Sequence, residues 1–245
     1  MVTSNSNNPI KSLASLPRGR PVDARALKAL GASSSLASHY VRSGWLTRLG
    51  RGVFMFPGDQ LEAAAVVKFL GSHLPSLHVG GKTALAWRGV RHNVGPRERL
   101  VLWGNAQWVL PSWFTERFPS RYVSRRLFSE SLPADFGLQP LPETPDGPAV
   151  SVPERALLEL LDDVGVNQGL EEARNIMEGV RSVHLDVLGT LLKHCPRVKA
   201  VRLCLNLADE LNLSWAAEAR KLAGPRGHGR WVSKLPDGTT LILKP

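Results

Sequence analysis

The stretch PVDARALKALGASSSLASHYVRSGWLTRLGRGVFMFP, residues 21–57, decides the fold of the first part of this 245-residue chain. Its polar caps, apolar positions and glycines predict a helix, a short turn, a second helix and a two-stranded wing. Asp23 can cap the first helix, and Gly31 and Gly44 can end the two helices because glycine tolerates a positive φ. A small winged helix of this kind places its second helix in the major groove of DNA.

The apolar residues of the stretch predict a small core. Spaced along the second helix and the wing, they are expected to face inward rather than to stack on bases: Leu36, Tyr40, Val41, Trp45 and Phe54.

Positive charge is concentrated in the same region. Residues 1–58 hold eight lysines and arginines against one acid, Asp23, which gives +7 of the chain's net charge of +10. Such a concentration of positive charge on one small module is the electrostatic property of a nucleic-acid-binding protein.

The predicted recognition helix covers about residues 33–43. Side chains near the start of such a helix contact base edges, so base contacts are expected from Ser33, Ser34, Ser35, Ser38, His39 and Arg42. Phosphate contacts are expected from the wing, from a flexible arm before the first helix and from that helix, at Arg48, Arg51, Arg18, Arg20 and Lys28. The alternative interpretation is an ordinary helical hairpin with solvated charges.

The rest of the chain predicts a second domain of mixed type. A turn at residues 57–59 indicates the boundary, so we expect an α+β protein with a winged helix at 1–58 and a mixed α/β domain at 59–245. A further short helix is predicted at 9–16. After the boundary, the patterns predict helices at 61–70, 82–87, 111–118, 168–180, 184–194 and 198–211, strands at 77–79, 99–103 and 121–128, connections or edge strands at 133–150, and a hairpin of 231–234 with 240–243.

A capping box predicts one more helix. Ser151 and Glu154 have the required spacing, and leucines follow them. Arg155 is expected to pair with an acid that fixes the fold. Asp162 and Asp163 are expected to be solvated at the exposed end of this helix.

No motif of the sequence commits it to catalysis. HVGGKTAL, residues 78–85, has the Gly-Lys-Thr of a phosphate-binding loop, but Ser76 stands where that loop needs glycine, so a tight strand-to-helix turn is expected. The seven histidines and two cysteines show no zinc-ligand spacing. We therefore expect no enzyme activity, no cofactor and no metal.

A second basic region occupies the end of the chain. It consists of Arg197, Lys199, Arg202, Arg220, Lys221, Arg226, Arg230, Lys234 and Lys244. Two interpretations stay open: a solvated surface, or a contact with flanking DNA or with the acidic face of a partner protein.

Composition restricts the location of the protein. Cys195 and Cys204 are too few for a disulfide framework, and no apolar stretch has the length of a membrane helix. The polar start MVTSNSNN is not typical of a signal peptide. We expect a cytoplasmic protein without membrane contact.

The sequence resembles a known family, the AbiEi antitoxins of type IV toxin–antitoxin systems. LPRGRPVDARALKALGASSSLASHYVRSGWLTRLGRGVFMFPGD, residues 16–59, resembles the N-terminal winged helix of that family. Four later segments resemble its C-terminal domain, in order: LHVGGKTALAWRGVRHNV at 77–94, LPSWF at 110–114, VSVPERALLELLDDV at 150–164 and VKAVRLCLNLADELNLSW at 198–215.

The resemblance implies a role in transcription. Antitoxins of this family are DNA-binding autorepressors that recognise repeats, commonly inverted, in their own promoter. They oppose a nucleotidyltransferase-like toxin, usually without a stable complex with it. By position, residues 33–42 would be the recognition helix and residues 45–56 the wing. Arg88, Arg91 and His92, near the glycine turn, are further candidates for contact with DNA or toxin.

Two alternatives belong to other functional classes. One is an antitoxin that binds a protein or RNA directly. The other is a nuclease that uses acids such as Glu143, Asp146, Asp162 or Asp163.

Overall fold

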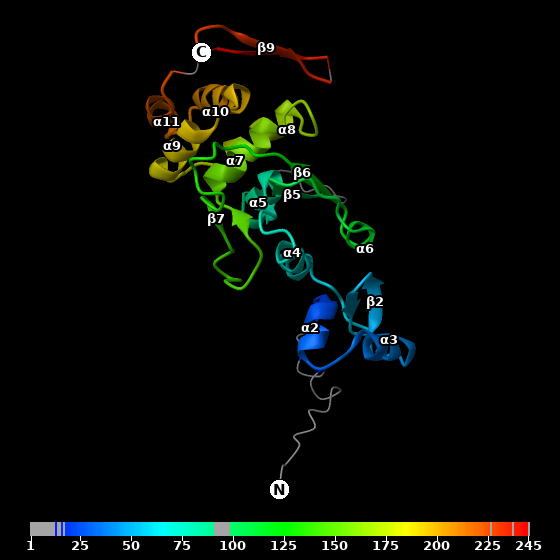
Figure 1. Ribbon diagram of the computed structural model, residues 1–245. Coiled ribbons are helices and arrows are strands. Elements are labelled where there is room, and N and C mark those ends of the chain that lie inside the picture. The colour runs from blue at the N-terminus through cyan, green and yellow to red at the C-terminus, as the bar shows by residue number, and fades with distance from the viewer. Residues whose placement is uncertain are drawn as a thin grey trace. The chain divides into compact units, whose positions relative to one another are not determined.

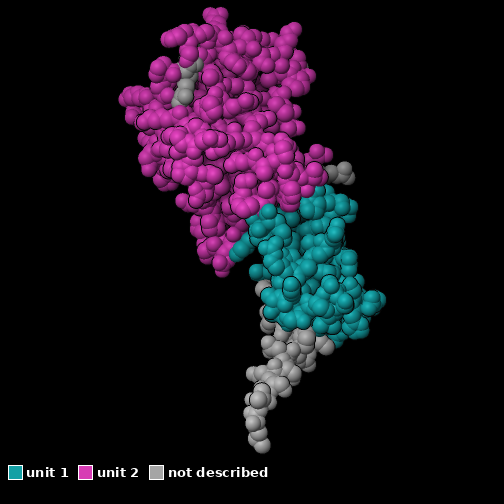
Figure 2. All heavy atoms as spheres, viewed as in Figure 1, with its two compact units in different colours: residues 1–73, 110–118 teal, residues 74–109, 119–245 magenta. Residues whose placement is uncertain are grey.

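The computed structural model describes residues 13, 16, 18–90, 99–225, 227–236 and 238–244. The chain divides into two compact units (Figure 2). Unit 1 comprises residues 1–73 and 110–118, and unit 2 comprises residues 74–109 and 119–245. The boundary expected after residue 58 stays a prediction.

Unit 1 contains the expected helix, turn, helix and wing (Figure 1). The elements are β1 (Val22–Asp23), α2 (Ala24–Ala29), α3 (Ser34–Arg42), β2 (Thr47–Gly50) and β3 (Val53–Met55). The strands form an antiparallel sheet in the order β1-β3-β2, so the wing hairpin is extended by the residues that precede α2.

Local chemistry sets the ends of both helices, as expected. The Asp23 carboxylate accepts a hydrogen bond from the Ala26 amide at 2.7 Å, and the Ser33 hydroxyl accepts one from the Leu36 amide at 3.2 Å. Gly31 and Gly44 have φ values of 85° and 75° after the helices, a conformation that costs glycine little.

The core of unit 1 agrees with the expected apolar positions except at one residue. Leu27, Tyr40 and Phe54 are buried, and Leu36 and Val41 pack against them partly buried. Trp45 is 52% exposed, so its prediction as a core residue is wrong. The chain turns after α3, where the Trp45 amide donates to the Tyr40 carbonyl, and this turn leaves the indole in solvent.

Unit 1 also includes α4 (Ala63–Gly71) and the short α6 (Ser112–Thr115), near the helices predicted at 61–70 and 111–118. A Cβ at Gly50 would lie 2.8 Å from Cδ1 of Trp113. Glycine therefore lets β2 lie directly against this indole.

Unit 2 is built on a five-stranded mixed sheet. Its strands are β4 (His78–Val79), β5 (Leu100–Gly104), β6 (Ser120–Ser124), β7 (Leu138–Gln139) and β8 (Val150–Ser151), in the order β6-β5-β4-β8-β7. β5 pairs with β6 in parallel and β4 with β8 in parallel, whereas the β4–β5 and β7–β8 pairs are antiparallel. The strand predicted at 121–128 ends earlier, at Ser124.

Helices surround the central helix α7 (Pro153–Asp162) in unit 2 (Figure 1). They are α5 (Gly81–Trp87), α8 (Leu170–Glu178), α9 (Leu185–His194) and α10 (Val198–Glu210), and α11 (Ala216–Ala223) packs against α9 and α10. From Glu154 onward every residue of α7 is buried. Helix α11 was not predicted, although its buried Ala216, Ala219 and Ala223 have helical spacing.

The capping box predicted for α7 is wrong. Val152 is the N-cap residue, and no side chain caps the helix. The Ser151 hydroxyl instead donates to Glu159 at 2.8 Å, and Glu154 accepts from the His184 amide at 2.6 Å. Both side chains join tertiary contacts, which the local spacing did not predict.

The last element is the predicted hairpin, with β9 (Trp231–Lys234) paired antiparallel to β10 (Thr240–Leu243). The predicted α+β class is confirmed. The helix expected at 9–16 lies outside the described residues except for Leu13 and Leu16, and Arg91, His92 and Arg226 lie outside them as well.

Candidate nucleic-acid interface

Helix α3, the predicted recognition helix, has one buried face and one exposed polar face. Ala37 and Tyr40 are buried in the core of unit 1. Ser35, His39 and Arg42 are exposed, and their spacing of four and then three residues places them on one face of the helix. Burial of the opposite face therefore leaves a polar stripe of three side chains open to a ligand.

The serine hydroxyls of α3 differ in their availability. The Ser33 hydroxyl caps the helix, and the Ser38 hydroxyl donates to the Ser34 carbonyl at 3.0 Å. The hydroxyls of Ser34 and Ser35 make no hydrogen bond within the described residues, and both side chains are exposed. Of the four predicted serine contacts, Ser34 and Ser35 are therefore the most available for a base edge or a phosphate.

The wing carries two of the predicted phosphate-binding residues. Arg51 is exposed at the turn between β2 and β3, which Gly52 forms with a φ of 71°. Arg48 is exposed opposite Phe54 in the strand register, and its Cζ lies 5.5 Å from the centre of that ring. The aromatic contact restricts the Arg48 side chain while its charge stays accessible.

The predicted arm is partly fixed. Arg18 forms an ion pair with Asp59 at 2.7 Å and lies 4.4 Å from the centre of the Phe56 ring. A phosphate would therefore compete with Asp59 for this guanidinium. Arg20 and Lys28 are exposed, and the structure records no ion pair for either of them within the described residues.

Two exposed residues of this module were not among the predicted contacts. Arg25 lies exposed on α2, and Trp45 lies exposed between α3 and the wing. The sequence contained the charge of Arg25, but nothing in its pattern distinguished the indole of Trp45 from a core aromatic.

Helix α7 and its C-terminal end place their acids in buried networks rather than in solvent. Glu159 is 1% exposed and accepts hydrogen bonds from His78 and Arg155 at 2.9 Å each, and from the Gly81 amide at 3.0 Å. Burial alone would raise the pKa of Glu159, but the charges and hydrogen bonds of His78 and Arg155 lower it to about 2. Arg155 thus pairs with an acid, as expected.

The prediction of solvated acids at the end of α7 is wrong. Asp162 is fully buried and pairs with Arg125 and with Arg197, whose Nε lies 3.0 Å from Oδ1 of Asp162. Asp163 is 2% exposed and pairs with Arg121. Paired arginines make these carboxylates structural, and they are poorly suited to hold the metal of a nuclease.

The glycine turn joins β4 to α5, as expected. Gly80 is the N-cap of α5, and Gly81 has a φ of 52°. Arg88, a predicted contact with DNA or toxin, instead donates to the backbone carbonyls of Ser151, Gln139 and Val150. This part of the motif holds β7 and β8 against α5.

Much of the late basic region is engaged within the fold. Besides Arg197, Lys199 donates to the carbonyls of Asp162 and Val164, and burial lowers the pKa of Lys199. Arg202 is 3% exposed. A wholly solvated surface is therefore the wrong description of this region.

The described residues offer neither a metal site nor a membrane-spanning helix. They contain no group of three or more His, Cys, Asp or Glu side chains placed to hold a metal ion. None of the helices in this part of the chain combines the length and apolar character needed to cross a membrane.

Comparison with known proteins gives solved structures of similar fold and two family models. The crystal structure of the RV2827C protein from Mycobacterium tuberculosis matches with a TM-score of 0.59 at 16% identity, covering 95% of this chain and 88% of that one. No curated protein matches the chain.

The family models together span most of the sequence. The model described as "Transcriptional regulator, AbiEi antitoxin N-terminal domain" matches residues 5–95. The model described as "Transcriptional regulator, AbiEi antitoxin, Type IV TA system" matches residues 97–239. The chain therefore belongs to the AbiEi family of type IV toxin–antitoxin systems, a family of transcriptional regulators and not of enzymes.

Proposed function

We propose that this antitoxin represses its own promoter by inserting α3 into the major groove. The observation that carries the proposal is the stripe of Ser35, His39 and Arg42, exposed on α3 opposite the buried Ala37 and Tyr40. Arginine can read a guanine edge through two hydrogen bonds, and serine can bond to several bases. A helix anchored on one face and polar on the other suits this role.

Flanking cations would provide affinity without reading sequence. Arg48 and Arg51 of the wing, together with Arg20 and Lys28, would bind phosphates and release counterions from the duplex. The proposed operator consists of inverted repeats, as the resemblance to AbiEi antitoxins implies, and two copies of one small module would read such a two-fold symmetric site. Promoter DNA lies in the cytoplasm, where we place the protein.

The proposal includes an opposing toxin. In this proposal the antitoxin opposes a nucleotidyltransferase-like toxin without forming a stable complex with it. The alternative, direct binding to a toxin or an RNA, predicts stable co-purification of the two partners.

The decisive experiment is a fluorescence-anisotropy titration at low and moderate salt. The full chain is titrated with its own upstream region and with a scrambled duplex of equal length. Preference for the upstream DNA that persists at moderate salt is expected. Equal binding to both duplexes that disappears as salt rises would refute the proposal and favour the toxin-binding alternative.

Two arginine variants connect the result to α3. Arg42→Ala is expected to reduce the preference for upstream DNA. Arg181→Ala, an exposed arginine of unit 2, is the matched control and is expected to leave the preference unchanged.

A further inference from the structure

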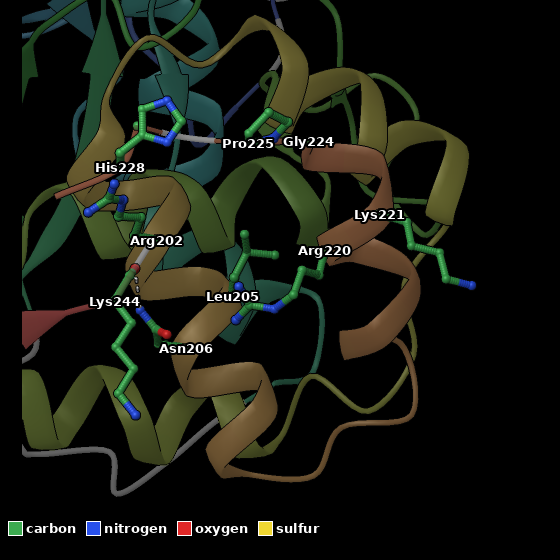
Figure 3. Close-up of a pocket in the computed structure, with 10 residues that line it drawn as sticks. Arg202, Leu205, Asn206, Arg220, Lys221, Gly224, Pro225, His228 and Lys244 are labelled. Atoms are coloured by element: carbon green, nitrogen blue, oxygen red, sulfur yellow. Dashed lines mark hydrogen bonds between the residues drawn. The ribbon is translucent and has the colours of Figure 1, made fainter. Parts of the chain in front are cut away.

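Unit 2 contains a basic cavity of about 460 Å³ between α10, α11, residues 224, 225, 227 and 228, and Lys244 after β10 (Figure 3). Six polar or charged side chains line it: Arg202, Asn206, Arg220, Lys221, His228 and Lys244. None of the described residues that line it is acidic. Figure 3 shows Lys221 pointing away from the other labelled side chains, so the cations available to one ligand are those of Arg202, Arg220 and Lys244.

Arg202 is held in a fixed position at the buried side of this cavity. It is 3% exposed, and its guanidinium donates to the Gly229 carbonyl. Gly227 has a φ of 84°, and a Cβ there would lie 3.2 Å from Nη2 of Arg202. The glycine allows the loop to lie close against the guanidinium, which is thereby positioned before any ligand arrives.

The remaining cations differ in how far they are neutralised. Arg220 shares its charge with Asp209, with 3.1 Å between Nε and Oδ2, and Lys221 pairs with Glu218 at 3.0 Å. Both pairs are exposed and therefore weak. Lys244 has no ion pair within the described residues.

We propose that this cavity binds a small phosphate-bearing ligand. Arginine and lysine are the side chains that proteins use to hold phosphate oxygens. The volume lies within the range of small-molecule sites, and Leu205 and Pro225 add apolar wall for the rest of such a ligand.

The concave shape favours a small ligand over duplex DNA. A duplex carries its phosphates on a regular convex backbone, whereas a terminal phosphate can reach a buried guanidinium inside a cavity. This inference does not rest on the proposed function, because the cavity belongs to unit 2 and the recognition helix to unit 1.

The test is isothermal titration calorimetry of the full chain with pyrophosphate at constant ionic strength, with chloride as the reference anion. Wild-type protein is expected to bind pyrophosphate, and Lys244→Gln to bind it about tenfold more weakly, as for the loss of one charged hydrogen bond. Lys193→Gln, an exposed lysine of α9 outside the cavity, is the matched control and should bind like wild type.

A second variant tests the buried guanidinium. Arg202→Lys keeps the charge and removes the planar fork, so at least tenfold weaker binding is expected where circular dichroism shows an intact fold. If Arg202→Lys does not fold, the pyrophosphate affinities of Lys244→Gln and Lys193→Gln are sufficient to test the proposal.

Titration with ADP as a second probe distinguishes a nucleotide ligand from recognition of the phosphate groups alone. Tighter binding of ADP than of pyrophosphate supports a nucleotide that uses the apolar wall, and equal binding supports recognition of phosphate alone. Absence of pyrophosphate binding at millimolar concentration, or equal weakening by Lys193→Gln, overturns the proposal. A Lys244→Gln variant that loses affinity only for duplex DNA overturns it in favour of a nucleic-acid contact.

Discussion

Nε2 of His78 lies 2.9 Å from Oε1 of Glu159, although 81 positions separate the two residues in the sequence. Both side chains are buried, and the other ring nitrogen of His78 lies 2.9 Å from the Ser76 carbonyl. Both nitrogens thus face oxygen atoms that only accept hydrogen bonds. The pair thus connects β4 to the central helix α7.

Removal of the Glu159 charge should destabilise the protein and change how its stability depends on pH. Glu159→Gln leaves His78 and Arg155 buried without their carboxylate, and such a loss costs about 3–5 kcal/mol. The folded pKa of Glu159 is about 2, below its ordinary 4.5, so its carboxylate stabilises the fold above the unfolded pKa. This stabilisation, about 3 kcal/mol, is lost as pH falls toward 2.

Urea denaturation at several pH values, followed by circular dichroism, tests this prediction. The difference between wild type and Glu159→Gln should narrow as pH falls from 5 to 2. Glu130→Gln, whose side chain is 88% exposed, is the control and should follow wild type throughout. A constant difference across this range would show that the buried carboxylate is not stabilised by its partners.

Gly80→Ala should disrupt the same site by overpacking. A Cβ at residue 80 would lie 2.4 Å from Oε2 of Glu159 and 2.5 Å from Cδ1 of Trp103, where neither neighbour has room to move. A loss of about 1–3 kcal/mol in the free energy of unfolding is expected. Gly169→Ala, which would meet nothing within 4 Å, should change it by much less. Equal effects would mean that glycine is not required at position 80.

Contacts between residues distant in sequence, such as that of His78 with Glu159, explain why the sequence predicted some features and missed others. Caps and turns such as Asp23 and Gly31 depend on neighbours a few residues away, and the structure confirms them. The acids at the end of α7 look like a solvated helix end because their arginine partners come from β6, the segment after it and the residue before α10, all distant in sequence. The basic cavity was missed for the same reason, since three separated segments form it.

Loss of the α3 cap should weaken unit 1 without removing the exposed stripe. Ser33→Ala leaves the Leu36 amide without its side-chain acceptor, which costs about 1 kcal/mol. Ser35→Ala, whose hydroxyl has no partner in the described part of the chain, should change stability little. Thermal unfolding of both variants compares them directly, and equal midpoints would contradict the capping role.

Arg51→Ala should weaken binding to all DNA alike. Its guanidinium is exposed at the wing turn, where a phosphate contact carries no sequence information. Loss of one phosphate contact should make the plot of log K against log salt concentration less steep, by about 0.9 in its negative slope. Anisotropy titrations at several salt concentrations measure this slope. Arg181→Ala is the control, and an unchanged slope for Arg51→Ala would exclude the wing contact.

Arg42→Ala and Ser35→Ala should change which DNA is preferred. Both side chains lie on the exposed stripe of α3, and a good base contact discriminates by about 1–3 kcal/mol. The ratio of affinities for upstream and scrambled duplex should therefore fall about tenfold for Arg42→Ala and less for Ser35→Ala. Arg51→Ala is the comparison variant, because it should lower the affinities for both duplexes and preserve their ratio. If Arg42→Ala lowered both affinities but preserved their ratio, the Arg42 guanidinium would contact phosphate. If Arg42→Ala and Ser35→Ala both left the affinities for the two duplexes unchanged, α3 would not be the recognition helix.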